Sequence, residues 1–128
     1  AALGLDGQVE FLGHCGDVPG LLMRHRICVL ATHFEGMPLS LIEGMAAGCA
    51  VAGSRVVGVQ EVIADGRNGL LAAHADPAAL ADAVQQWLTP EAAPQVAAVQ
   101  QRFAALHQSL LRDTSTLAAQ AIETLIYA

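Results

Sequence analysis

The stretch that decides the fold is Glu35-Gly36-Met37-Pro38-Leu39-Ser40-Leu41-Ile42-Glu43. An apolar run at residues 27–31 leads into it, and a small-residue helix pattern at residues 39–48 leads out of it. This order predicts a strand, a tight loop with a glycine and a proline, and then the start of a helix. Free backbone N–H groups and the positive end of a helix dipole would gather at that junction, which favours a bound phosphate group.

Two carboxylates, Glu35 and Glu43, flank this junction. An ionised oxygen accepts hydrogen bonds more strongly than a neutral one, so carboxylates suit the hydroxyl groups of a sugar. The helix that carries Glu43 is otherwise almost uncharged, so an ordinary solvated face explains this residue less well than a ligand does. For Glu35 the alternative is a solvated loop glutamate. A phosphate site beside a polyol site predicts that the ligand is a nucleotide sugar.

Strand-like and helix-like patterns alternate along the first two-thirds of the chain. We expect strands at residues 9–13, 27–32, 50–54 and 70–73, and helices at residues 18–25, 39–48 and 60–64. Asp76-Pro77 predicts a further helix, with Asp as its N-cap and Pro at its first position. The fold class predicted is therefore α/β, Rossmann-like, with a parallel sheet in a three-layer domain. Breaks at residues 89–94 and near Asp113 separate two amphipathic C-terminal helices.

Composition and charge limit the function classes. Hydrophobic residues make up 54% of the 128 residues and charged residues only 14%, which indicates a well-buried core and not a disordered tail. The net charge of −6, with arginine but no lysine, argues against a nucleic-acid-binding face. No apolar run is long enough to cross a bilayer, and no basic start followed by an apolar stretch marks a secretion signal. We therefore expect a cytoplasmic protein.

Metal binding is not expected from the sequence. Cys15, Cys28 and Cys49 show no metal-ligand spacing, and no Asp-x-Asp pair occurs. Cys28 falls in an apolar strand and Cys49 directly precedes another, so we expect buried, reduced thiols. His33 stands next to the junction, but other histidines are scattered along the chain, and we assign it no catalytic role.

Four ordered blocks resemble a known family. Residues 35–48, EGMPLSLIEGMAAG, are similar to the two-glutamate (E-x7-E) motif of the large "glycosyl transferases group 1" family of retaining glycosyltransferases with the GT-B architecture. Residues 58–71 resemble the family's next block, and residues 9–13 and 17–19 resemble the strand and helix that precede the motif. The likeness covers roughly residues 3–88 in the family's order, which is more specific than one glutamate pair.

The resemblance implies a hexosyltransferase-type enzyme of polysaccharide or glycoconjugate biosynthesis, which moves a sugar from a nucleoside diphosphate to a hydroxyl acceptor with retention and without a metal or other cofactor. Glu35 would be its catalytic residue, orienting the donor sugar near the reacting carbon, and Glu43 would accept hydrogen bonds from the ribose. The other donor-binding residues would be the loop that supplies backbone N–H groups and two residues beside the nucleotide base: Gly36, Met37, Pro38, Leu39, Ser40, Gly13 and His14.

Three positions depart from the family's pattern. Val57-Gly58 stands where two adjacent glycines are usual, Ala50 replaces a proline, and Gly44 replaces an alanine. The family's phosphate-clamping Arg and Lys have no counterpart in the blocks present here. The helix dipole, together with the family's basic residues that lie outside these blocks, would neutralise the diphosphate.

The resemblance also implies a division of the chain. Residues 1–88 would be the donor-binding α/β domain, incomplete at its N-terminus, and residues 89–128 a C-terminal helical extension that packs on it. The acceptor-binding domain, with any peripheral membrane association, would lie elsewhere in the same enzyme. We expect this chain alone to be inactive in transfer and to self-associate through an unpaired strand edge.

Two other functions fit parts of the pattern. A nucleotide-sugar epimerase of the same architecture would bind the same donor without an acceptor. A non-enzymatic receiver-type signalling module would share the α/β fold, but it would need an aspartate at a strand end. The predicted strands end in Thr32 and Ser54, which argues against the signalling module.

Overall fold

The computed structural model describes residues 4–111 and 113–127. Its centre is a parallel sheet of three strands in the order β1-β2-β3: β1 (Ile27–Leu30), β2 (Ala50–Ser54) and β3 (Leu70–Ala72). The register pairs Ile27 with Ala50 across the first ladder and Ala52 with Leu70 across the second. Because all three strands run in the same direction, their carboxyl ends meet at one edge of the sheet.

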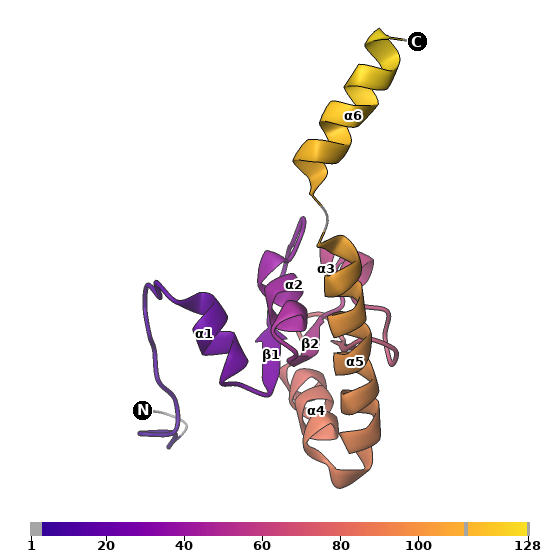
Figure 1. Cartoon of the computed structure of the whole chain (residues 1–128). Coiled ribbons are helices and arrows are strands. Elements are labelled where there is room, and N and C mark those ends of the chain that lie inside the picture. Colours follow the sequence, from indigo (N-terminus) through magenta and orange to yellow (C-terminus); the bar gives the residue numbers. More distant parts are fainter. Residues whose placement is uncertain (1–3, 112, 128) are drawn as a thin grey trace.

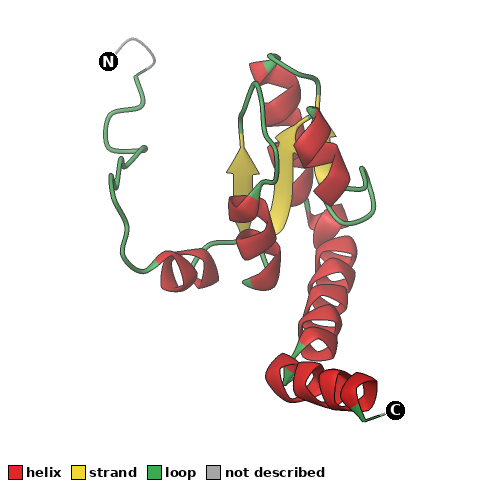
Figure 2. Cartoon of the chain, turned by 90° about the horizontal axis from the view of Figure 1, so that it is seen from above, coloured by secondary structure: helices red, strands yellow, loops and turns green. Residues whose placement is uncertain are grey.

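Helices cover both faces of this sheet (Figure 1, Figure 2). They are α1 (Val18–Met23), α2 (Leu39–Ala46), α3 (Val57–Val62), α4 (Pro77–Leu88), the 3₁₀ helix η1 (Pro90–Ala92), α5 (Ala93–Leu110) and α6 (Thr114–Ile126). On one face Val51 packs with residues of α2, α3 and α5. On the other face Ala50 and Ala52 pack with Trp87 of α4. The alternation along β2 therefore divides the core into two apolar layers.

Most of the predicted elements are confirmed. The strand at residues 50–54 has the predicted bounds, and α4 begins at Pro77 with the Asp76 carboxylate accepting a hydrogen bond from Ala79 N–H at 3.0 Å. The helix predicted at residues 60–64 begins earlier, at Val57, and ends at Val62. Asn68 explains this end, because its side chain donates to Val62 O at 3.0 Å and accepts from Ala64 N–H at 2.7 Å.

The predicted strand at residues 9–13 is wrong. This segment has irregular backbone, and Phe11 is 94% exposed. Both views show the chain before α1 lying away from the sheet (Figure 1, Figure 2). A strand is stable only when its backbone N–H and C=O groups pair with a neighbour, and none of the three described strands lies beside residues 9–13.

Two departures from the family's pattern have a structural reason. An added Cβ at Gly44 would lie 2.8 Å from Cβ and 2.9 Å from Sγ of Cys28, so the cysteine fills the space that an alanine at position 44 would need. Ala50 donates its backbone N–H to Arg26 O at 2.9 Å, a hydrogen bond that proline could not make. Both positions are therefore adjusted to their neighbours in β1 and just before it.

The C-terminal helices differ in how they contact the core. Val99 and Phe103 of α5 are buried against the sheet side of the molecule, whereas no described residue of α6 is buried. Figure 1 shows α6 extending away from the rest of the chain. Asp113 caps α6, accepting hydrogen bonds from Thr116 N–H at 3.0 Å and from its hydroxyl at 2.6 Å. Packing on the α/β part is thus carried by α5, and the domain boundary near residue 88 stays a prediction.

In the described part of the chain, no helix combines the length and apolar character that crossing a membrane requires.

Asp65 ties the segment after α3 to β3. One carboxylate oxygen accepts from Leu71 N–H at 2.9 Å and the other from the Arg55 guanidinium. Partial burial raises the pKa of Asp65, but the Leu71 N–H and Arg55 bonds outweigh it, so the pKa lies below its usual range. A pKa that is lower in the folded state stabilises the fold above the unfolded-state pKa of about 3.9. That contribution is lost as the pH falls through the folded-state value.

We therefore expect Asp65→Asn to lower the free energy of unfolding at pH 7 by up to about 1 kcal/mol, since both partners are partly exposed. The gap between variant and wild type should narrow as the pH falls below about 4, because the wild-type carboxyl then becomes protonated. Urea denaturation from pH 7 to pH 3 measures this gap. Asp82→Asn, on the exposed side of α4, is the matched control. If the difference in free energy of unfolding between Asp65→Asn and wild type does not change with pH, the stabilisation does not come from the charge of the Asp65 carboxylate.

Candidate functional site

The carboxyl edge of the sheet brings three loops together. They follow β1, β2 and β3 and contain residues 31–37, 55–56 and 73–76. Ser54, at the end of β2, is only 7% exposed, and its Oγ accepts a hydrogen bond from Thr32 N–H at 3.1 Å. The Thr32 hydroxyl donates in turn to Phe34 O at 2.8 Å, and Phe34 N–H approaches it at 3.3 Å. The start of the first loop is therefore held in a local turn against β2.

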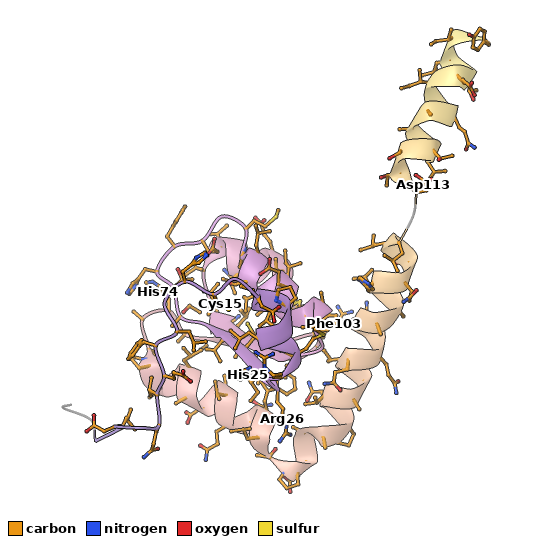
Figure 3. All side chains as sticks on the ribbon, turned by 60° about the vertical axis from the view of Figure 1, so that its left-hand side comes forward. Cys15, His25, Arg26, His74, Phe103 and Asp113 are labelled. Atoms are coloured by element: carbon orange, nitrogen blue, oxygen red, sulfur yellow. The ribbon has the colours of Figure 1, made fainter. Side chains whose placement is uncertain are left out.

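Two histidines join the outer loops across β2. His33 Nδ1 lies 3.1 Å from His74 Nε2, and the two rings are nearly perpendicular, with their centroids 5.1 Å apart and their planes at 79°. Figure 3 labels His74, which lies on the loop that follows β3. The loop after β1 is thereby connected to the loop after β3.

Gly58 allows α3 to approach the same loop closely. A Cβ added at Gly58 would lie 2.3 Å from the carbonyl oxygens of both Glu35 and Gly36. Real side chains cannot occupy that space, so only glycine lets this turn of α3 rest on the loop backbone. Val57, which stands in place of the other usual glycine, is exposed and clear of this contact. The single glycine is thus sufficient for the close approach.

Two open cavities lie at this edge, and His33 lines both. One, of about 290 Å³, is bordered by Glu35, Arg55 and His74. The other, of about 330 Å³, is bordered by Thr32, Ser54 and Asp76. Arg55 contributes little free positive charge to the first cavity, since its guanidinium is paired with Asp65.

The predicted phosphate-binding junction is the N-terminus of α2. Pro38 is buried and precedes the first helical residue, Leu39. Leu39 belongs to the loop expected to supply free backbone N–H groups to the donor, and for Leu39 this expectation is wrong, because its N–H donates to Met37 O at 2.9 Å and closes a tight turn. Within residues 4–111 and 113–127, the N–H groups of Met37 and Ser40 have no hydrogen-bond acceptor. The junction therefore offers two donors, both on exposed residues.

The two glutamates flank this junction in the sequence. Glu35 is half-buried in the loop, and Glu43 is exposed on α2. Burial raises the pKa of the Cys28 thiol, and the charges of Cys49 and Glu43 raise it further, so Glu43 lies near β1. Burial also raises the pKa of Cys49. Both thiols are therefore protonated at neutral pH and are poor nucleophiles.

Gly13 and His14 are not brought together with the glutamates. Both are exposed in the segment before α1, and neither lines the two cavities at the carboxyl edge. Their contact with a nucleotide base stays a prediction. The described residues also contain no group of three or more His, Cys, Asp or Glu side chains that could hold a metal ion.

Sequence reasoning assigns no role at this site to three residues that shape it: Ser54, Gly58 and His74. The sequence indicates Ser54 only as the end of a predicted strand, and His74 only as one of several scattered histidines. The signal that could have found them is topological, since the carboxyl ends of parallel strands meet at one edge. His33 and His74 both follow predicted strands within a few residues.

Comparisons with known proteins show the family and the fold of this chain. The sequence profile of the family described as "Glycosyl transferases group 1" matches residues 1–90. N-acetyl-alpha-D-glucosaminyl L-malate synthase of Bacillus anthracis is 36% identical over 89 residues, which cover 70% of this chain and 23% of that enzyme. The chain spans 13–24% of the length of several curated relatives that it matches.

Solved structures show the same fold. Anabaena Alr3699/HepE in complex with UDP-glucose superposes with a TM-score of 0.77 at 25% identity, covering 99% of this chain and 34% of that chain. The C-terminal domain of LpcC, a glycosyl transferase group 1 family protein from Francisella tularensis, gives a TM-score of 0.67 at 26% identity. That match covers 86% of this chain and 57% of the LpcC domain. The predicted Rossmann-like α/β fold, one half of a GT-B architecture, is confirmed.

We expect Gly58→Ala to destabilise the fold by about 1–3 kcal/mol, because the new Cβ would collide with two backbone carbonyls that have no side-chain freedom to move away. Helix propensity favours alanine over glycine by about 1 kcal/mol, so a net loss would show that the collision dominates. Urea denaturation measures the change. Gly16→Ala is the control, since no atom lies within 4 Å of a Cβ added there. Equal stability of the two variants would show that α3 does not rest on this loop.

Proposed function

Because the chain belongs to the glycosyl transferases group 1 family, we propose that it is the nucleotide-sugar-binding part of a retaining, metal-independent hexosyltransferase of the two-glutamate type. The observation that carries the proposal is the N-terminus of α2, where the N–H groups of Met37 and Ser40, between Glu35 and Glu43 in the sequence, have no acceptor among the described residues. The whole enzyme would transfer a sugar to a hydroxyl acceptor bound by another domain. We place it in the cytoplasm, in polysaccharide or glycoconjugate biosynthesis.

Different residues would bind different parts of the donor. The N–H groups of Met37 and Ser40, together with the dipole of α2, would hold the diphosphate. Glu35 would accept hydrogen bonds from the hydroxyls of the donor sugar and orient its reacting carbon. Glu43, about one turn along α2, would accept hydrogen bonds from the ribose. The backbone and helix dipole thus bind the charged part of the donor, and the carboxylates bind its polyols.

The relatives suggest which donor to test first. HepE was crystallised with UDP-glucose, and this chain matches 34% of the HepE chain. We therefore take UDP and UDP-glucose as the first probes of donor binding, and we assign neither the base nor the sugar of the natural donor.

An epimerase of the same architecture is the alternative that shares the donor. Product analysis with and without an acceptor separates the two, since an epimerase converts the donor sugar in the absence of acceptor. A receiver-type module is disfavoured, because the buried polar residue at the end of β2 is Ser54 and not an aspartate.

In the whole protein, Glu43→Ala should weaken donor binding by roughly tenfold to a hundredfold. This follows from the loss of a hydrogen bond to a charged group, which costs about 1.5–3 kcal/mol. Glu35→Ala should lower turnover more than UDP affinity, because Glu35 faces the sugar and not the nucleotide. Calorimetric titration with UDP and steady-state kinetics with UDP-glucose measure the two effects. Glu91→Ala, in the exposed η1 segment, is the matched control. Wild-type binding and turnover in both site variants would sink the assignment.

Activity should survive chelation of divalent cations. The proposed diphosphate site consists of backbone N–H groups and a helix dipole, which need no bridging cation. Transfer rates measured in excess EDTA should equal those in buffer within about twofold, a difference that corresponds to less than about 0.5 kcal/mol in barrier. Complete loss of transfer in EDTA with recovery on adding Mn²⁺ would contradict metal independence.

A further inference from the structure

The loop that carries Glu35 is held by groups that lie outside it. Ser54 of β2 accepts from Thr32 N–H at 3.1 Å, His74 of the β3–α4 loop contacts His33 at 3.1 Å, and Gly58 of α3 rests on the Glu35 and Gly36 carbonyls. The loop's own large side chains contribute little, since Phe34 is 85% exposed and Met37 is 64% exposed. Its conformation therefore depends on these three contacts more than on apolar burial.

The histidine contact is suited to fix the loop in one arrangement. A neutral imidazole has one N–H donor and one acceptor nitrogen, so a pair at 3.1 Å requires one ring to donate and the other to accept. The ring planes are nearly perpendicular, at 79°, and the nitrogen-bearing edges of the two rings meet. His33 is two residues before Glu35 in the same loop, so a shift of His33 would move the backbone that carries the Glu35 carboxylate.

We propose that His74 is a positioning residue for Glu35, acting through His33 and the loop backbone. This rests on the proposed function, in which Glu35 orients the donor sugar. His74 comes from a different loop and need not touch the donor. Its contribution is to hold the Glu35 carboxylate where the sugar hydroxyls will be, with Ser54 and Gly58 fixing the two ends of the same segment.

The size of the effect follows from the geometry. Displacing a catalytic group by about 1 Å can cost on the order of a hundredfold in rate, although no contact with the substrate is lost. Removal of His74 leaves the contacts of Ser54 and Gly58 in place, so we expect a smaller loss. The donor's diphosphate contacts at α2 should be unaffected, because Met37 and Ser40 lie beyond the Gly58 contact.

The experiment compares three variants of the whole protein, His74→Ala, His74→Gln and His107→Ala. His74→Ala should lower kcat with UDP-glucose about tenfold while the Kd for UDP changes by less than about twofold. His74→Gln should restore most of kcat, since the glutamine amide can replace Nε2 as a partner of His33. His107→Ala, on α5, should behave as wild type. Wild-type kcat in His74→Ala, or equal losses in the alanine and glutamine variants, would overturn the proposal.

A double-mutant cycle separates this inference from the proposed function. If His74 acts through Glu35, His74→Ala should have almost no effect on kcat in the Glu35→Ala background. Full additivity of the two losses would overturn the positioning role while leaving Glu35 in the site. An unchanged kcat in Glu35→Ala would instead overturn the proposed function.

NMR gives a readout that needs no activity. In ¹⁵N–¹H spectra, His74→Ala should shift the backbone amide signals of His33 and Glu35 and leave those of α5 unchanged. Unmoved Glu35 signals would overturn the proposal even if no sugar transfer were detected.

Discussion

The parallel pairing of β2 with both of its neighbours is the constraint on which the molecule depends. Every residue of β2 is buried, and the alternation of Val51 with Ala50 and Ala52 supplies both core layers. Trp87 of α4 adds a buried hydrogen bond from its indole N–H to Val51 O at 3.0 Å. Because the three strands share one direction, the loops that follow them come together at one edge. The site thus follows from sheet topology before any side chain is considered.

Polar contacts then give that edge a defined shape. Apolar packing ends at Pro38 and Val59, and the loop between β1 and α2 exposes most of its bulky groups. A serine hydroxyl, a pair of imidazoles and a close glycine contact hold this loop in place. Each contact joins segments that are distant in sequence. Local sequence preference alone therefore does not set the position of Glu35.

A feature could be predicted from the sequence where local residues determine it, and could not where contacts between distant segments determine it. The strand at residues 50–54 and the cap at Asp76 were predictable, because burial periodicity and capping chemistry are local properties. The strand at residues 9–13 was predicted wrongly, since its pattern is strand-like but pairing requires a neighbour that sequence periodicity does not reveal. The loop motif pointed to Glu35, whereas His74 and Gly58 are recognisable only once the loops are placed in space. The occupied Leu39 N–H likewise depends on a turn whose geometry the residue types did not specify.

The end of burial at Phe103 divides the chain into two dynamic regimes. Amides in the sheet exchange with solvent only when the core opens cooperatively, whereas none of the described helical residues beyond Phe103 is buried. A helix the length of α6, at 13 residues, is marginal in water on its own, because helix nucleation is costly and tertiary contacts normally supply most of its stability. The helicity of α6 therefore depends on contacts between its surface and other groups. Amide hydrogen exchange should therefore be slow in the sheet and in α5 up to about one turn after Phe103, and fast beyond that point.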